Sequence, residues 1–167
     1  MSLLKRVKRE VTSSMPTLNN PQLMRQIIMD HYQNPRNKRK PIGTDYQQIH
    51  MDSVSCVDDI FVYVKIDNNR IVDCCFDGVG CTISIASTSM MTELVLGKTL
   101  EEAQQLMKHF LAMVHGQAYD EEILDEAIVF MNTSKQASRI KCATIGWDGL
   151  HEIMAHQHKN PKEDQHE

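Results

Sequence analysis

The sequence predicts a mixed fold, in which a small antiparallel sheet of three strands is combined with about five helices. The first observation is a run rich in β-branched and aromatic residues, IFVYVKI at 60–66, followed after a polar turn by a second such run. The second is that helical periodicity replaces this pattern on both sides of it. The third is the absence of any internal repeat or change in composition, so the 167 residues predict one domain.

The two ends of the chain are expected to lie outside this domain. Residues 1–19 mix basic residues with Ser, Thr and Pro and show no sustained periodicity, which is typical of a disordered extension. A targeting peptide is the less favoured alternative, because only the basic start supports it. We expect the domain over residues 20–158 and a disordered polar tail over 159–167.

The first helix is expected over residues 20–32. Asn20-Pro21 supplies a cap and a first-turn proline. Apolar residues then recur at helical spacing until Pro35, which restricts the residue before it and ends the helix. The basic run at 38–40 is expected to be a solvated loop.

The strands are expected next. Residues 59–76 form a β-hairpin whose turn is Asp67-Asn68-Asn69. An isolated hairpin is only marginally stable, so a third strand is expected around residues 48–54.

Four helices are expected after the sheet. The first opens near Cys81 and is stopped by Gly97, and the second follows the capping box that begins at Thr99 and runs to about Val114. Asp120 starts the third, and the last runs from about Ser134 to His156.

Composition excludes some functions. A formal net charge of −4 argues against nucleic acid as a partner. No stretch approaches the roughly 20 apolar residues that a membrane span needs. We therefore expect no membrane partner and a cytoplasmic location. In that compartment the five cysteines are expected to stay reduced, which directs attention to thiol or metal chemistry.

Three cysteines fall at element ends or on a helix. Cys56 precedes the hairpin, Cys81 opens a helix and Cys142 lies in the last helix. Together with Asp58 they would supply three sulfurs and one oxygen, a tetrahedral set suited to zinc. The spacing is not the close CxxC pairing of zinc ribbons, so the pattern alone does not decide for a metal.

Local context bears on each thiol. A helix N-terminus favours the thiolate of Cys81, and Arg139 and Lys141 would favour that of Cys142, although both are as readily explained as surface charges. Cys74 and Cys75 are neighbours in a strand and face opposite ways, so they are left out of the site. Gly78-Val79-Gly80 is too short for a phosphate loop and more plausibly lets the backbone turn toward the metal.

Four segments carry a family resemblance. They are MDHYQNPRN at 29–37, SCVDD at 55–59, FDGVGCTIS at 76–84 and RIKCA at 139–143. In these segments the sequence resembles the U-type iron-sulfur cluster assembly family, which includes IscU and the NifU N-terminal domain. Lys141, in place of a ligand histidine, and the long segment between Cys81 and Cys142 point to its SufU branch.

The resemblance implies an α+β fold and a zinc site formed by Cys56, Asp58, Cys81 and Cys142. It implies iron-sulfur cluster assembly through a zinc-dependent sulfurtransferase activity, in which a SufS-type cysteine desulfurase passes persulfide sulfur to Cys56. Zinc would hold Cys56 as a thiolate until a desulfurase histidine replaces it as ligand. Arg139 would assist docking or transfer, and downstream iron-sulfur assembly or acceptor proteins would receive the product.

Two other functions stay open on the sequence. The same cysteines would serve a non-enzymatic scaffold that assembles and transfers a [2Fe-2S] cluster, or iron, and a purely structural zinc domain is the third interpretation. The chain departs from the family at Val57, where a glycine is usual, and a β-branched residue takes positive φ with difficulty. We therefore expect the ligand loop to be shaped or stiffened differently.

Overall fold

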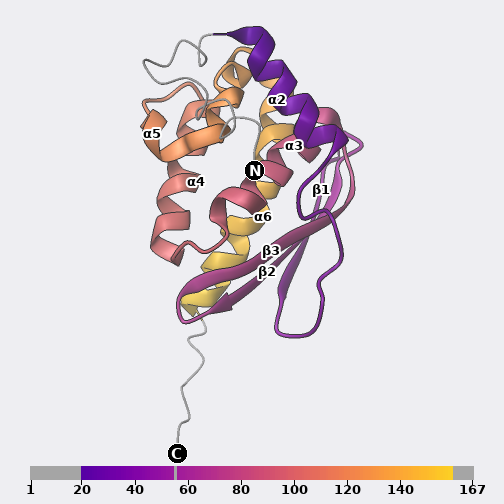
Figure 1. Ribbon diagram of the computed structural model, residues 1–167, viewed down its shortest axis with the longest axis vertical. Helices are drawn as coiled ribbons and strands as arrows, with labels where there is room; N and C mark the ends of the chain where they lie inside the picture. The colour runs from indigo at the N-terminus through magenta and orange to yellow at the C-terminus, as the bar shows by residue number, and fades with distance from the viewer. Residues whose placement is uncertain (1–19, 55, 160–167) are drawn as a thin grey trace, which may run out of the picture.

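A computed structural model describes residues 20–54 and 56–159 of this chain. The predictions for residues 1–19 and for 160–167 lie outside the described residues. The elements along the chain are α2 (Pro21–Gln33), β1 (Gln47–Asp52), β2 (Asp59–Asp67), β3 (Arg70–Val79), α3 (Thr82–Val95), α4 (Leu100–Val114), α5 (Glu121–Leu124), the 3-10 helices η2 (Asp125–Phe130) and η3 (Thr133–Lys135), and α6 (Ala137–Lys159). The predicted α+β fold, a three-stranded antiparallel sheet packed against five α-helices, is confirmed over the described residues (Figure 1).

The sheet has the strand order β1-β2-β3, and both pairs are antiparallel. Asn68 and Asn69 connect β2 to β3 with φ values of 48° and 61°. Positive φ at both central residues is the conformation of the two-residue hairpin turn that matches strand twist, and asparagine tolerates it. The predicted third strand is β1, which pairs with β2 from Gln47 opposite Val64 to Asp52 opposite Asp59.

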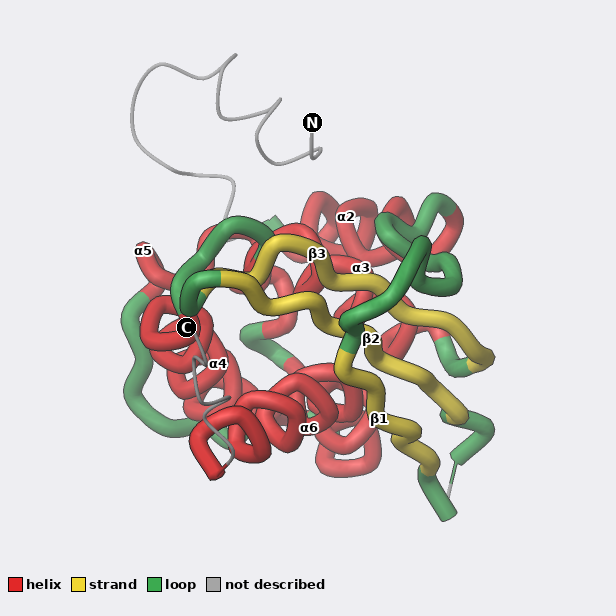
Figure 2. Tube along the Cα trace, turned by 90° about the horizontal axis from the view of Figure 1, so that it is seen from below, coloured by secondary structure: helices red, strands yellow, loops and turns green. Residues whose placement is uncertain are grey.

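Helices α3 and α6 cover one face of the sheet, with α6 running beneath β1 and β2 (Figures 1 and 2). The alternate residues Ile60, Val62 and Val64 of β2 have no exposed surface. Trp147 of α6 is also fully buried and stacks on Phe110 of α4 with ring centroids 4.2 Å apart. This single core fixes α3 and α6 against the sheet, and both helices carry site residues.

The other face of the sheet is crossed by the loop after α2 (Figure 2). The backbone of Arg39 donates to Phe76 of β3 at 2.8 Å, and its guanidinium pairs with Asp73 at 2.9 Å. Burial alone would raise the pKa of Asp73, but hydrogen bonds from Tyr46 and Arg39 outweigh burial and lower it. The predicted loop keeps Lys38 and Lys40 exposed, while Arg39 is half-buried and pairs with Asp73 of β3. The run is thus solvated as predicted and is also held against β3.

Two of the later helices differ from the prediction. The capping box at Thr99 and Glu102 is confirmed at the start of α4. The helix expected from Asp120 stops after four residues, because Asp125 takes φ of 47° and the chain continues as η2. Every residue from Glu126 to Phe130 is buried, so this segment has no exposed face that an amphipathic helix would need.

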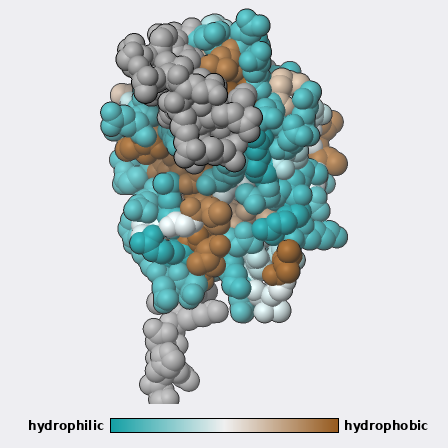
Figure 3. Space-filling model, viewed as in Figure 1, coloured by the Kyte–Doolittle hydropathy of each residue, from teal (hydrophilic) through white to brown (hydrophobic). Residues whose placement is uncertain are grey.

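The last helix starts three residues later than predicted, at Ala137, and extends to Lys159. None of the helices in the described part of the chain is long and apolar enough to cross a membrane. The face seen in Figure 3 is mostly hydrophilic, with separate apolar patches between the charged side chains.

Candidate metal centre

Three connections of the fold converge on one group of side chains. The loop between β1 and β2 carries Cys56 and Asp58, the junction between β3 and α3 carries Cys81, and the first turns of α6 carry Cys142. The sheet and α6 pack directly on each other, which is why residues 86 positions apart in sequence meet here.

The thiols of Cys56 and Cys142 lie close together without a bond. Their sulfur atoms are 3.8 Å apart, and both cysteines are free. A disulfide requires about 2.05 Å between the sulfurs, so this is a non-bonded contact. Together with a carboxylate oxygen of Asp58, the ligand atoms all lie within 4.8 Å of one another.

Asp58 is a buried carboxylate with oriented hydrogen bonds. Its residue is 2% exposed. Its Oδ1 accepts from the backbone N–H of Cys81 at 3.0 Å and from the hydroxyl of Ser84 at 2.8 Å. Such donors fix the direction in which the carboxylate presents its lone pairs.

Cys81 stands beside the group but outside it. It is the N-cap residue of α3, and its sulfur accepts from the backbone N–H of Ser84 at 3.4 Å. The prediction that Cys81 opens a helix is thus confirmed. Of the four predicted ligands, three have their ligand atoms grouped within 4.8 Å. Cys81 adjoins that group through its backbone N–H, which donates to Asp58, and through its side chain, which interacts with the thiol of Cys142.

The thiol of Cys142 is the most buried of the three. Its residue is 1% exposed. Burial raises the pKa of Cys142 well above its ordinary value, and the neighbouring Cys81, Asp58 and Cys56 raise it further. The prediction that Arg139 and Lys141 favour the thiolate of Cys142 is wrong for the thiol without a metal, because both of these side chains are exposed.

The donor set fits a zinc ion. Tetrahedral coordination with zinc-sulfur bonds of about 2.3 Å places two sulfurs about 3.8 Å apart. The separation of Cys56 and Cys142 has this value. Two thiolates and a carboxylate are ligands that zinc accepts.

Glycine at position 80 makes the approach of Asp58 possible. A Cβ atom at Gly80 would lie 2.3 Å from the hydroxyl of Ser84 and 3.1 Å from Oδ1 of Asp58. Gly78 takes φ of 117°, and a Cβ there would lie 2.1 Å from the carbonyl oxygen of Asp59. A side chain at either position would therefore collide with the segment that carries Asp58 or with the hydroxyl that orients it.

Val57 stands where a glycine is usual in the family, and it fits the loop without the positive φ that a glycine would allow. It is not among the described residues with positive φ, and it is 72% exposed. The β-branched side chain therefore points away from the ligand group and makes no demand on the backbone there.

Two of the other predicted features lie outside the ligand group. Arg139 is exposed, lies one turn before Cys142 on α6 and lines a groove beside α2. Cys74 and Cys75 are both fully buried within β3, and burial raises the pKa of each. Ser84 is the site residue that sequence reasoning missed, although it belongs to the segment FDGVGCTIS.

The chain is similar to several known proteins. Residues 23–163 match the family model of the NifU-like N terminal domain. The chain is 42% identical over 134 residues to the zinc-dependent sulfurtransferase SufU of Bacillus subtilis, which covers 80% of this chain and 90% of that protein. It is 38% identical to the iron-sulfur cluster assembly scaffold protein IscU of Streptococcus pyogenes, over 77% of this chain and 80% of that one.

A solved structure shares the fold. It is described as an iron-sulfur cluster assembly scaffold protein for the SUF system from Fervidobacterium islandicum. It superposes with a TM-score of 0.67 at 32% identity and covers 76% of this chain and 93% of that one.

Proposed function

This chain belongs to the family of NifU-like N-terminal domains, and we propose that it acts in iron-sulfur cluster assembly as a zinc-dependent sulfurtransferase. The observation that carries the proposal is the grouping of Cys56, Cys142 and Asp58 within 4.8 Å, at the spacing of a tetrahedral zinc site. The 42% identity to a protein named for this activity supports it.

We assign the metal ligands to Cys56, Asp58, Cys81 and Cys142. Three of them are already grouped, and Cys81 at the start of α3 is the fourth, because its side chain interacts with that of Cys142. Zinc would supply the charge that keeps the thiols deprotonated and shields them from oxidation.

Cys56 is the proposed sulfur acceptor because of its exposure. It is exposed, whereas Cys142 is buried and Cys81 is half-buried in a helix cap. The Cys56 thiolate attacks the terminal sulfur of a persulfide on the donor protein. A new sulfur-sulfur bond forms on Cys56, the donor's sulfur-sulfur bond breaks, and the donor's cysteine leaves as a thiolate. No outside oxidant or reductant is needed.

The partner in this step is a cysteine desulfurase, which we propose to be of the SufS type, and the sulfur then passes to downstream iron-sulfur assembly or acceptor proteins. Arg139, one turn from Cys142, is placed to contact such a partner because it is exposed beside the thiols.

A scaffold that assembles a [2Fe-2S] cluster is the second candidate. It is favoured by the 38% identity to an IscU scaffold protein, and the same thiols would hold the cluster as cargo. The ligand group found among the described residues contains a carboxylate and no histidine, which agrees better with the zinc proposal.

The test compares Cys56→Ala with the wild-type chain and with Cys75→Ala, a matched control at a buried cysteine outside the site. Metal content is measured by mass spectrometry, and persulfide transfer by the mass gain of the chain after incubation with a desulfurase and cysteine. We expect about one zinc per chain in the wild type and loss of transfer only in Cys56→Ala. Iron with labile sulfide would favour the scaffold, and transfer retained by Cys56→Ala would contradict the acceptor assignment.

A further inference from the structure

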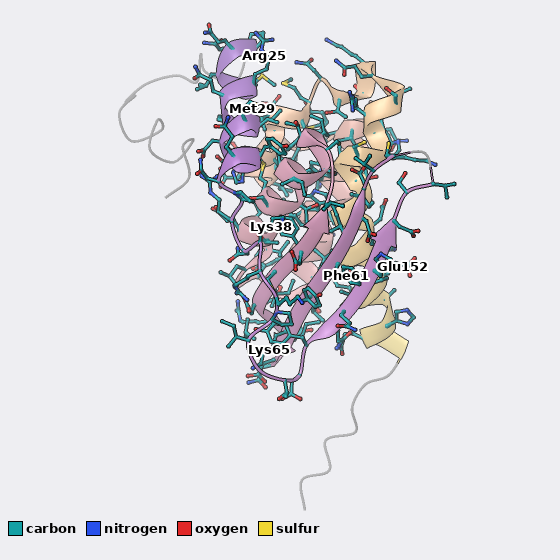
Figure 4. The ribbon with its side chains drawn as sticks, turned by 90° about the vertical axis from the view of Figure 1, so that its right-hand side faces the viewer. Arg25, Met29, Lys38, Phe61, Lys65 and Glu152 are labelled. Atoms are coloured by element: carbon teal, nitrogen blue, oxygen red, sulfur yellow. The ribbon has the colours of Figure 1, made fainter. Side chains whose placement is uncertain are left out.

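A groove lies beside the thiols, between α2, the first turn of α3, the 3-10 helices and the start of α6. Its volume is about 230 Å³, and apolar side chains form its floor. These are Met24, Ile28, Ile83 and Val129. Figure 4 shows Arg25 near the N-terminal end of α2, and this side chain and Arg139 line the groove from opposite helices.

Neither arginine is used by the fold. Arg25 and Arg139 are both exposed, and within residues 20–54 and 56–159 neither side chain has an ion pair or hydrogen bond. By contrast, Arg36 pairs with Asp30 and Glu93, and Arg39 pairs with Asp73. Among the described residues, neither of the two guanidinium groups that line the groove has an ion-pair partner, in a chain whose formal net charge is −4.

The helix direction adds to this positive potential. Gln136, which directly precedes the 23-residue α6, and Arg139 in its first turn line the groove, so the N-terminal end of that helix dipole lies beside it. Asn132 and Gln136 add amide groups to the rim. The site therefore combines an apolar floor with positive walls.

The groove is adjacent to the candidate metal centre. Arg139 precedes Cys142 by three residues on α6, and side chains at that spacing lie on one face of a helix. Ile83 follows Cys81 by two residues. Whatever fills the groove lies about one helical turn from the cysteines.

We infer that this groove docks an acidic segment of the sulfur-donating protein, with an apolar side chain on the floor and carboxylates on Arg25 and Arg139. The inference rests on the proposed function, because it identifies the partner surface of the same site. Pockets that enclose drug-sized ligands have about 300–1,000 Å³, so the present volume fits one or two side chains better than a whole small molecule. The chain's own residues 1–19 carry four basic residues and one acidic residue, so their charge opposes binding here.

The experiment measures the affinity of the zinc-loaded chain for its cysteine desulfurase by calorimetry, without cysteine, for the wild type and Arg25→Glu. Lys108→Glu is the matched control, because it makes the same charge change at an exposed position of α4 outside the groove. Arg25→Lys tests whether a positive charge at this position is enough for binding of the desulfurase. Zinc content and the thermal midpoint check that each variant is intact.

We expect Arg25→Glu to weaken binding about tenfold and Lys108→Glu to leave it unchanged, with the difference shrinking at high salt. Arg25→Lys should retain most of the affinity. Transfer at saturating desulfurase should stay within about twofold in Arg25→Glu, since a docking residue changes the concentration needed rather than the chemistry.

Wild-type affinity in Arg25→Glu would overturn the inference and leave the proposed function standing. Conversely, an Arg25-dependent complex in which the wild-type chain accepts no sulfur would contradict the proposed function and support the groove.

Discussion

Replacing Ser84 by alanine tests whether Asp58 is a metal ligand that the protein orients. The serine hydroxyl donates to Oδ1 of Asp58 at 2.8 Å, and both residues are buried, at 0% and 2% exposure. In Ser84→Ala, Oδ1 of Asp58 loses one of these two hydrogen-bond donors and keeps only the backbone N–H of Cys81. The carboxylate becomes less well oriented, while no metal ligand is removed.

The expected loss follows from the kind of hydrogen bond that is deleted. A hydrogen bond to a charged group contributes about 1.5–3 kcal/mol. A loss of about 2 kcal/mol corresponds to roughly 30-fold in an equilibrium constant. This lies within the 10–100-fold by which removal of groups behind metal ligands typically weakens metal binding. We therefore expect zinc to bind about 30-fold more weakly in Ser84→Ala.

The assay is competition for zinc against a chromophoric chelator at fixed pH. The control is Ser89→Ala on the same helix, because Ser89 is also buried but its hydrogen bonds go to Arg36 and His31, away from the thiols. Both variants should lose stability, and only Ser84→Ala should lose zinc affinity. Equal zinc affinity of Ser84→Ala and wild type would refute the assignment of Asp58 as an oriented ligand.

Two further variants test the glycine turn and the loop that covers the sheet. Gly80→Ala should weaken zinc binding at least about tenfold in the same competition assay, because the new methyl group displaces either the Asp58 carboxylate or the hydroxyl that orients it. Asp73→Asn should lower stability at pH 7 by about 1 kcal/mol and flatten its acid dependence in urea titrations. The pKa of Asp73 is lowered in the folded chain, so its contribution to the free energy of unfolding is present at neutral pH and is lost as pH falls through the folded pKa. The same dependence of stability on pH in Asp73→Asn and wild type would contradict this.

The elements that the sequence predicts well are those with strong local signals. Asn20 caps α2 as expected, and its side chain accepts hydrogen bonds from the backbone N–H groups of Gln22 and Leu23. The capping box at the start of α4 forms as the sequence predicts. The segment after Asp120 was predicted as a regular helix and is not one, because its conformation depends on tertiary burial. Glu126 there lies 3.5 Å from the buried His31 of α2, and no local pattern contains that contact.

The candidate site is likewise predicted only in part from the sequence. Residue types and family motifs indicated Cys56, Asp58, Cys81 and Cys142, and the structure brings the ligand atoms of three of them together. The role of Ser84 could not be predicted, because it depends on a hydrogen bond between residues 26 positions apart. The effect of Arg139 on Cys142 was mispredicted for a related reason: proximity in sequence suggested a charge effect, whereas burial of the sulfur dominates its pKa.

The electrostatics of the group explain why a cation belongs there. Burial raises the pKa of the Cys142 thiol, and the neighbouring thiols and carboxylate raise it further, so its surroundings oppose ionisation of Cys142. No arginine or lysine of the described residues forms an ion pair with Asp58. The hydrogen bonds to Asp58 orient it but bring no full positive charge. A divalent ion would stabilise several thiolates and the carboxylate at once, and the exposed Cys56 could then be held deprotonated at the surface where a partner protein reaches it.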